Sequence, residues 1–497
     1  MSAHYVNEWC ADHWKFFTVP DKQWHVLKVY RKVNRSNYVN CATHKQKSDF
    51  PLHNLSLMIE CKPALTCYIP MMTADLEILG YFSIIKSSLG LFDPTESSIR
   101  LGKLTFREKT IRTPNCILYT IKGSVPHLTP DNLRLLPFGA VQVTLEHFVD
   151  VQPPPSTQFP DGIHKFLNLE DFLVFYDIRD PGKIQISSFN TEHYVAVRTH
   201  QGVRKVTPKN YIDYTNIYKP DIVTSMADIL YSKKPGQNRV SKSVTRTLQW
   251  LDELLNNKKL TADRRIQEGI HVFGVLVGDQ YHEERKRCAK ETVKRDVSGF
   301  VLQGLALGTT LEERIDLFKI SLDCLPEDKP RFAYGLGTPD GIFAGIAAGI
   351  DLFDTSYPTK MAESGHALTF SLKIFNNQNG IEASKSSTIS HSINLFDSQF
   401  KKDFRPFVPT CTCIACLNHS RAYVHHLVKA REMLGSILLI SHNLLQYAQF
   451  FQDIRESIKN GTFEKDVKRF KDVFGVIEEL DPDTLASSSP SKEENSL

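Results

Sequence analysis

The pattern of apolar and polar positions changes after the first 150 residues. Up to that point the chain has short β-prone runs separated by Pro and Gly, such as Leu55–Ile59, Ile117–Ile121 and Val141–Leu145, and no strong helical period. The next segment, Val151–Gly162, holds four prolines in twelve residues and is predicted to be a linker or loop. We therefore expect residues 1–150 to form a β-rich N-terminal part.

Strand-like runs recur in the second half of the chain. Phe300–Gly308 is a short apolar run that ends in Gly, and Arg331–Gly337 and Asp351–Tyr357 are two further runs of this kind. Helical patterns lie between them. Strands that alternate with helices through short connections are typical of a parallel α/β fold. An open doubly wound sheet and a closed barrel both fit this alternation.

Start signals mark the helices between these runs. Thr310 begins a capping box with Glu313, which opens an amphipathic stretch. Thr338 and Pro339 supply an N-cap and a first-turn proline for a helix over Asp340–Ile350. Both signals place helix N-termini directly after strand-like runs.

A long helix is predicted near the C-terminus, over Ser420–Lys459. Its apolar positions recur at helical spacing: Tyr423, Leu427, Ala430, Leu434 and Ile437. The polar, Ser-rich tail over residues 481–497 is expected to be disordered.

Composition narrows the class of protein. A chain of 497 residues is long enough for roughly three domains at about 150 residues each. Its 41% hydrophobic and 23% charged residues argue against wholesale disorder or a coiled coil. The net charge of +4 permits a nucleic-acid partner without arguing for one. No apolar stretch reaches the ~18 residues of a membrane span, and the N-terminus lacks a signal-peptide core. We expect a soluble, cytoplasmic protein.

The strongest chemical signal is the run C-T-C-I-A-C, in which Cys411, Cys413 and Cys416 fall within six residues. The other seven cysteines are scattered and are most simply read as buried thiols. Thiolate and imidazole are the ligands that Zn²⁺ prefers, so a zinc site competes with a reading of three ordinary thiols. With four ligands such a site is structural, because no position stays open for water. Four histidines are candidates for the fourth ligand: His419, His425, His426 and His442.

In this region the sequence resembles the tRNA-guanine transglycosylases, whose zinc motif is C-x-C-x2-C followed by a distant His on a helix. The family spacing from the third Cys to the His is 26 residues, and His442 stands 26 residues after Cys416. The resemblance therefore implies His442 as the fourth ligand. It continues upstream through Gly304–Gly308, Leu325–Ile342 and Gly349–Thr359.

The resemblance implies an α/β fold, a (β/α)8 TIM barrel over residues 151–400, with a zinc-binding helical subdomain over 401–480. Members of this family exchange guanine at the wobble position of certain tRNAs for queuine or a precursor. A carboxylate attacks C1′ of the ribose and displaces guanine, and the incoming base then takes the glycosyl-enzyme intermediate. The nucleophile position falls on Asp354, at the C-terminal end of a predicted strand.

Other motifs of the family are altered here. Where the family has two arginines after P-T, this chain has Lys360 and Glu363, so an anion replaces a cation that suits phosphate. Val277 stands at the position of the base-reading Gln and offers no hydrogen bond to a base edge. Ile178 and Arg179 stand where the family has glycines that let a planar base approach the backbone. Asp177 and Asp228 fall by position near the active-site acids and are candidate relics of them.

A retained zinc motif with an eroded base pocket resembles the non-catalytic, accessory subunit of the heterodimeric eukaryotic queuine enzymes of this family. That resemblance implies a catalytic partner subunit, tRNA, one structural Zn²⁺ per chain, and a zinc subdomain at the dimer interface. It also allows a peripheral association with the mitochondrial outer membrane. On this reading Asp354 is a relic and the chain has no catalytic residue of its own.

Two rival hypotheses remain from the sequence. The first is a self-sufficient tRNA-guanine transglycosylase that uses Asp354 as nucleophile. The second is a zinc-stapled scaffold that no longer binds tRNA. Basic residues do not decide between them, because Arg285–Arg287, Lys290 and Arg239–Arg246 are more typical of solvated helix faces than of phosphate clamps.

Overall fold

The structure is a computed structural model of the whole chain, and contacts divide it into residues 1–79 and 80–497. In the first unit the backbone describes two antiparallel strand pairs: β1 (Phe16–Thr18) with β2 (His25–Leu27), and β3 (Met58–Cys61) with β4 (Leu65–Tyr68). In the second unit the described residues are 82–85, 98–106, 109–151, 154, 157, 161–183, 190–232, 234–257, 270–304, 309–373 and 390–477. The predicted tail over 481–497 and most of the predicted loop over Val151–Gly162 lie outside them.

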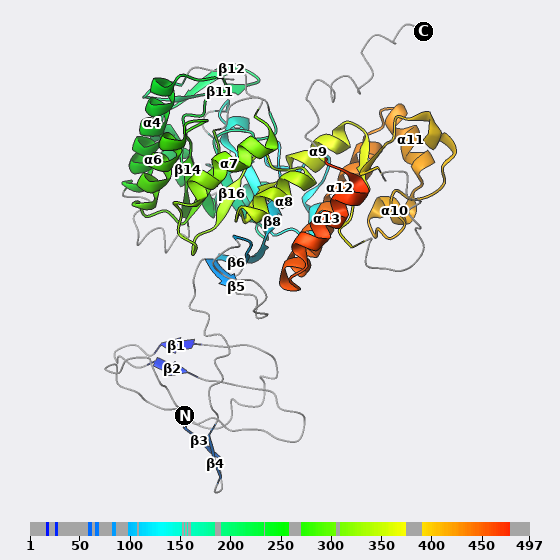
Figure 1. Cartoon of the computed structure of the whole chain (residues 1–497), viewed down its shortest axis with the longest axis horizontal. Coiled ribbons are helices and arrows are strands. Elements are labelled where there is room, and N and C mark those ends of the chain that lie inside the picture. Colours follow the sequence, from blue (N-terminus) through cyan, green and yellow to red (C-terminus); the bar gives the residue numbers. More distant parts are fainter. Residues whose placement is uncertain are drawn as a thin grey trace. The chain divides into compact units, whose positions relative to one another are not determined.

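An eight-stranded parallel sheet forms the centre of the second unit (Figure 1). The strands, in the order of the sheet, are β8 (Asn115–Ile117), β17 (Leu352–Asp354), β16 (Arg331–Ala333), β15 (Gly299–Leu302), β14 (His271–Leu276), β13 (Ile222–Thr224), β10 (Leu173–Asp177) and β9 (Ala140–Thr144). Just beyond β8, Leu118 forms a parallel bridge with Val141 of β9, and its N–H donates to the carbonyl of Ala140 over 3.0 Å. The two ends of the sheet therefore meet, and the barrel prediction is confirmed over the open sheet.

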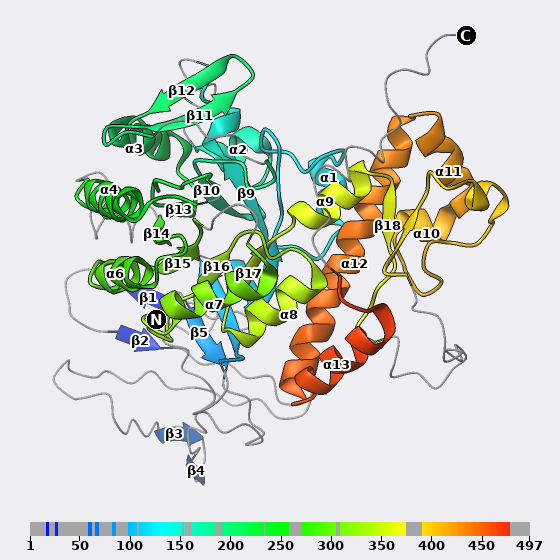
Figure 2. The same cartoon turned by 45° about the horizontal axis from the view of Figure 1, so that its top comes forward.

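Helices follow the strands and lie outside the sheet (Figure 2). Their bounds are α3 (Pro208–Tyr218), α4 (Gln237–Leu255), α6 (His282–Val293), α7 (Leu311–Leu322), α8 (Pro339–Ala347) and α9 (Ser356–Glu363). The predicted capping box is present at α7, where Thr310 accepts from the N–H of Glu313 and the Glu313 carboxylate accepts from the N–H of Thr310. Thr338 likewise caps α8 by accepting from the N–H of Gly341.

Side chains fill the interior of the barrel. Phe175, Phe273 and Phe332 come from the alternate strands β10, β14 and β16, and the ring of Phe175 lies 5.8 and 5.9 Å from the other two. Side chains from alternate strands form such layers in (β/α)8 barrels. Active sites of this architecture are built where the strands end in their C-terminal residues, and the loops there are the place to look for chemistry.

The barrel begins earlier in the chain than residue 151, where the sequence predicts it. Both β8 and β9 precede that residue and belong to the eight-stranded sheet. The β-prone runs Ile117–Ile121 and Val141–Leu145 overlap both strands, but the sequence pattern places them before the barrel, because β8 has only three residues and all five residues of β9 are buried. A strand that is covered on both faces shows no alternation of apolar and polar positions.

The single long helix predicted over Ser420–Lys459 is wrong. The segment forms α11 (Arg421–Lys429) and α12 (Met433–Lys459), separated by Arg431 at a φ of 56°. A left-handed residue without a glycine's freedom ends the helical path there. Of the apolar positions that suggested a single helix, Tyr423 and Leu434 are exposed.

The remaining elements of the second unit surround the barrel. They are β5 (Phe82–Ile85), β6 (Leu101–Phe106), β7 (Lys109–Thr113), α1 (Pro130–Arg134), η2 (Leu145–His147), α2 (Ile163–Leu167), β11 (Val195–Thr199), β12 (Gly202–Val206), β18 (His366–Leu368), β19 (Ser392–Asn394), η5 (Ser398–Lys402), α10 (Ile414–Asn418) and α13 (Phe463–Phe474). Phe450 of α12 packs against Phe343 of α8 and Phe470 of α13, so the C-terminal helices share the core of the barrel. Across the described residues, no helix is long and apolar enough to cross a membrane.

Candidate functional site

Four predicted metal ligands meet in the C-terminal region. Nδ1 of His442 lies 3.5 Å from Sγ of Cys411, 3.3 Å from Sγ of Cys413 and 3.4 Å from Sγ of Cys416. These four atoms all lie within 4.8 Å of one another. Two elements bring them together, because Cys413 caps α10 and His442 projects from α12. The structure thus selects one of the four candidate histidines.

The arrangement fits a tetrahedral metal ion. A tetrahedral Zn²⁺ with bonds of about 2.3 Å to sulfur and about 2.0–2.1 Å to nitrogen holds the sulfur and nitrogen roughly 3.5 Å apart, which matches the distances to His442. Nε2–H of His442 donates to the carbonyl of Leu368 over 2.8 Å, so the lone pair of Nδ1 faces the three sulfurs. The N–H of Cys416 points at Sγ of Cys413 over 3.3 Å and favours its thiolate.

Two of the other three candidate histidines contact groups outside the cluster. Nδ1 of His425 lies 2.7 Å from the carbonyl of Leu395, and this side chain is buried in the subdomain. The ring of His419 stacks on that of Tyr423 at 5.2 Å. Neither contributes to the Cys3His cluster.

Asp354 ends β17 at the mouth of the barrel, and it is buried. One carboxylate oxygen accepts from the N–H of Gly335 over 2.9 Å. The other accepts from the N–H of Ser356 over 2.9 Å and from the Ser356 hydroxyl. These bonds tie the end of β17 to the loop after β16. In this structure the Asp354 carboxylate accepts hydrogen bonds that have a structural role.

Asp177, at the end of β10, lies in a closed polar network. One oxygen accepts from the N–H of Ile178 over 2.6 Å, and the other accepts from the Tyr334 hydroxyl over 2.8 Å. The Tyr334 oxygen in turn accepts from the side-chain amide of Gln142 over 2.9 Å. Burial raises the pKa of Asp177 above its ordinary value. A buried acid with a raised pKa is a typical active-site group. Here, however, both oxygens of Asp177 already accept hydrogen bonds from Ile178 and Tyr334.

Asp228 is neutralised by arginines. Arg239 donates to both of its oxygens, over 2.7 and 2.8 Å, and Arg246 donates over 3.1 Å. The amide of Asn190 adds a bond of 2.9 Å. Burial opposes the charge of Asp228, but the hydrogen bonds from Arg239 and Asn190 outweigh it and hold its pKa below the ordinary value. Arg239 and Arg246 therefore serve a buried ion-pair cluster, and their prediction as a solvated helix face is wrong.

Arg285 is a second basic residue that the sequence pattern misplaces. Its side chain is fully buried, and its guanidinium donates to the carbonyls of Asp279 and Gly304 over 2.6 and 2.9 Å. Burial lowers the pKa of Arg285 to about 10. Arg287 matches the prediction better, since it is partly exposed and pairs with Glu284 on its own helix.

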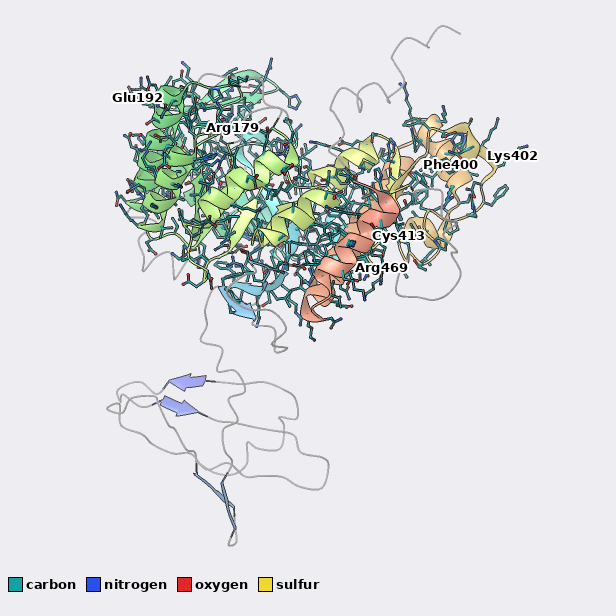
Figure 3. All side chains as sticks on the ribbon, in the orientation of Figure 1. Arg179, Glu192, Phe400, Lys402, Cys413 and Arg469 are labelled. Atoms are coloured by element: carbon teal, nitrogen blue, oxygen red, sulfur yellow. The ribbon has the colours of Figure 1, made fainter. Side chains whose placement is uncertain are left out.

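Bulky side chains occupy the positions that read a base in the resembled family. Val277 follows β14 and is buried, and Ile178 follows β10 and is buried. Arg179 is 5% exposed, its guanidinium donates to Asn190 Oδ1 over 2.9 Å, and it lies 5.2 Å from the ring centre of Tyr231. Figure 3 shows Arg179 in the barrel and Cys413 well away among the C-terminal helices. The altered base-reading positions and the Cys3His cluster are thus separate features.

Comparison with known proteins identifies the family of the chain. A family model described as "TGT: Queuine tRNA-ribosyltransferase" matches residues 95–475. The chain belongs to the queuine tRNA-ribosyltransferase family. Three similar relatives are named queuine tRNA-ribosyltransferase accessory subunit 2. The protein from Xenopus tropicalis is 34% identical over 382 residues, covering 71% of this chain and 91% of the relative. The human protein is 34% identical over 393 residues (73% and 94%), and that of Trichoplax adhaerens is 31% identical over 388 residues (76% and 98%).

Sequence reasoning missed a surface of this family member beside the metal centre. Phe404, Leu417 and Tyr423 line a shallow hollow next to Cys416. Phe404 is 81% exposed and Leu417 66% exposed, and neighbouring Ile414 on α10 is also exposed. We call this set, Phe404, Ile414, Leu417 and Tyr423, the α10 patch. Exposed apolar patches of this kind mark interaction surfaces. The signal available in the sequence was a short run of apolar residues within a polar, Cys-rich loop.

Proposed function

We propose that this chain is the non-catalytic subunit of a heterodimeric queuine tRNA-ribosyltransferase. In this role it supports the exchange of guanine for queuine at the wobble position of tRNA by a catalytic partner, through dimerisation and tRNA positioning. The relatives named as accessory subunits support this proposal. The observation that carries it is the filled base pocket, in which Arg179 and Val277 replace groups that would admit and read a purine.

The chemistry of the pocket explains why this chain lacks an active site of its own. A base-exchange site needs a slot for a planar base and polar groups along its edge. Buried Val277 offers no donor or acceptor, and the guanidinium of Arg179 is held in place by Asn190 and by the carbonyl of Ala196. Asp354 is present at the nucleophile position, but both of its oxygens accept hydrogen bonds from the backbone. A retained carboxylate without a base slot has nothing to attack.

We propose Zn²⁺ as the ion of the metal centre, one per chain. Cys411, Cys413, Cys416 and His442 would hold it, and three thiolates with one imidazole suit Zn²⁺ better than hard cations such as Mg²⁺. Four protein ligands complete a tetrahedron, so the ion would stabilise the link between α10 and α12 and take no part in base exchange.

We assign the α10 patch to the contact with the catalytic subunit. The patch is apolar, it lies beside the metal centre, and α10 is held in position by Cys413 and Cys416. By ordering α10, the bound ion would hold the α10 patch in the position in which it contacts the catalytic subunit. The cytoplasmic location, with attachment at the mitochondrial outer membrane, stays a prediction.

Substitution of Asp354 separates this proposal from a self-sufficient enzyme. In the heterodimer, Asp354→Asn in this chain is expected to leave the rate of guanine exchange within about twofold of wild type. The matching substitution of the nucleophile in the catalytic subunit should lower the rate by roughly 10³ or more. Asn is chosen because its side-chain oxygen still accepts one backbone N–H, whereas Ala would leave buried donors unpaired at about 1–3 kcal/mol each.

The measurement is incorporation of labelled guanine into tRNA by the purified heterodimer. Thermal unfolding of the Asp354→Asn chain controls for a structural effect. A loss of exchange comparable to that caused by the partner's substitution, in a chain that unfolds normally, would favour the self-sufficient enzyme instead.

A further inference from the structure

A basic hairpin stands at the mouth of the barrel. β11 and β12 pair between the C-terminal end of β10 and the start of α3, so they belong to a loop on the face where barrel active sites form. Figure 2 shows the hairpin beside α3. Between residues 190 and 210 the sequence has four Lys or Arg residues and one acidic residue, Glu192.

The register of the hairpin divides its side chains between two faces. Val195, Val197 and Val206 share the inner face and are buried. Ala196 pairs with Lys205 and Arg198 with Val203, which places Arg198 and Lys205 diagonally on the outer face. Both cations are exposed, and Val203 between them is 57% exposed.

The outer cations have no acidic partner within the described part of the chain. The acidic contacts of the hairpin are Glu192 with His193 and Asp150 with Arg204, and Arg204 is an inner-face residue. Nζ of Lys205 instead lies 5.0 Å from the ring centre of Tyr194. An ammonium and a guanidinium on the strand pair, with an aromatic ring directly before β11, are the groups that contact nucleic-acid backbones and bases.

Hydrogen bonds to neighbouring residues also fix the hairpin in position. Arg179 donates to the carbonyl of Ala196 over 3.1 Å, and Asn190 accepts from the N–H of Ala196 over 3.1 Å. On the inner face, Asp150 accepts from Arg204 over 2.7 Å and from Thr199 over 2.8 Å. The residue that fills the base pocket, Arg179, therefore also anchors the hairpin. Because the strands that carry Arg198 and Lys205 are anchored, the backbone of the hairpin loses little conformational entropy on binding.

We propose that the outer face of the β11–β12 hairpin binds phosphates of the tRNA backbone, with Arg198 and Lys205 as the contacting residues. This inference rests on the proposed function, because it assumes that the heterodimer engages tRNA. In a catalytic subunit this face of the barrel reads a base, whereas in this chain it would hold the tRNA backbone. Such contacts position the RNA without reading its sequence.

The double variant Arg198→Ala/Lys205→Ala tests the inference in the intact heterodimer. The probe is an unmodified tRNA transcript with guanine at the wobble position, and the dissociation constant is measured at several salt concentrations. Each lost phosphate contact removes roughly 0.7–0.9 from the magnitude of the slope of log affinity against log salt, so that magnitude should fall by about 1.4–1.8. The matched control is Lys242→Ala/Lys290→Ala, which removes two exposed charges from the outer helices α4 and α6 and should leave the slope at its wild-type value.

The outcomes separate this inference from the function beneath it. A double variant that assembles with the catalytic subunit but keeps the slope of the control variant would overturn the hairpin assignment alone. Loss of binding to vesicles containing phosphatidylserine, with the tRNA slope unchanged, would assign the cations to a membrane and also overturn it. A wild-type chain that forms no complex with the catalytic subunit would instead remove the proposed function. Thermal unfolding of the double variant should match wild type, because both side chains are exposed.

Discussion

Cys413→Ser is expected to remove the metal ion, release the segment around α10 and abolish assembly with the catalytic subunit. Sγ of Cys413 lies 3.3 Å from Nδ1 of His442 and accepts from the N–H of Cys416, so it touches two other members of the cluster. In small zinc domains the ion contributes roughly 10–16 kcal/mol to folding. That is comparable with the whole stability of a typical domain, about 5–15 kcal/mol. The contacts of neighbouring residues are therefore too weak to offset the stability that is lost with a thiolate ligand.

Three measurements follow this effect. Zinc content should fall from one ion per chain to background, limited proteolysis should cleave between Asp403 and Ser420, and the heterodimer peak in size-exclusion chromatography should disappear. The matched control is Cys324→Ser, which makes the same chemical change at a half-buried thiol at the end of α7, outside the cluster. A Cys413→Ser chain that retains one zinc and assembles as well as the Cys324→Ser chain would show that the cluster is not a structural metal site.

Leu417→Asp is expected to weaken the heterodimer by roughly 30- to 700-fold. Leu417 lines the hollow with Phe404 and Tyr423, and a central apolar residue of an interface contributes about 2–4 kcal/mol as a hot spot. The substitution also places a charge where the proposal puts an apolar partner surface. Because the side chain is 66% exposed in this chain, the stability of the isolated subunit should hardly change.

The dissociation constant of the heterodimer, measured by analytical ultracentrifugation, checks this expectation. Leu135→Asp is the matched control, since Leu135 is 80% exposed at the end of α1 and lies outside the α10 patch. Equal affinities for the two variants would mean that the α10 patch is not the contact surface. Base exchange by the Leu417→Asp heterodimer should recover when the subunit concentration is raised above the weakened dissociation constant.

Local signals in the sequence predicted those parts of the fold that depend on local interactions. The capping residues Thr310 and Thr338 mark their helices correctly, because the capping bonds span only three residues. The closure of the barrel depends on the pairing of Leu118 with Val141, and the alternation of strands and helices alone left it open. The break at Arg431 escaped notice because apolar residues continue at helical spacing across it.

The site was predictable to different degrees for a similar reason. Three cysteines within six residues favour a metal site over ordinary thiols, and family spacing points to His442, which the structure brings to them. By contrast, the environment of Asp228 is built from Arg239, Arg246 and Asn190, which come from other segments of the chain. A basic helical stretch gives no sign of a buried carboxylate across from it. The same holds for the role of Arg179 as anchor of the hairpin.

Base exchange by the purified chain, alone and then mixed with a catalytic subunit, tests the central claim most directly. Labelled guanine or queuine is supplied with a tRNA that carries guanine at the wobble position. We expect no incorporation above background by the chain alone, because buried Arg179 and Val277 stand where groups that admit and read a base are needed, and robust incorporation by the mixture. Incorporation by the chain alone that Asp354→Asn abolishes would contradict this account and make Asp354 a working nucleophile.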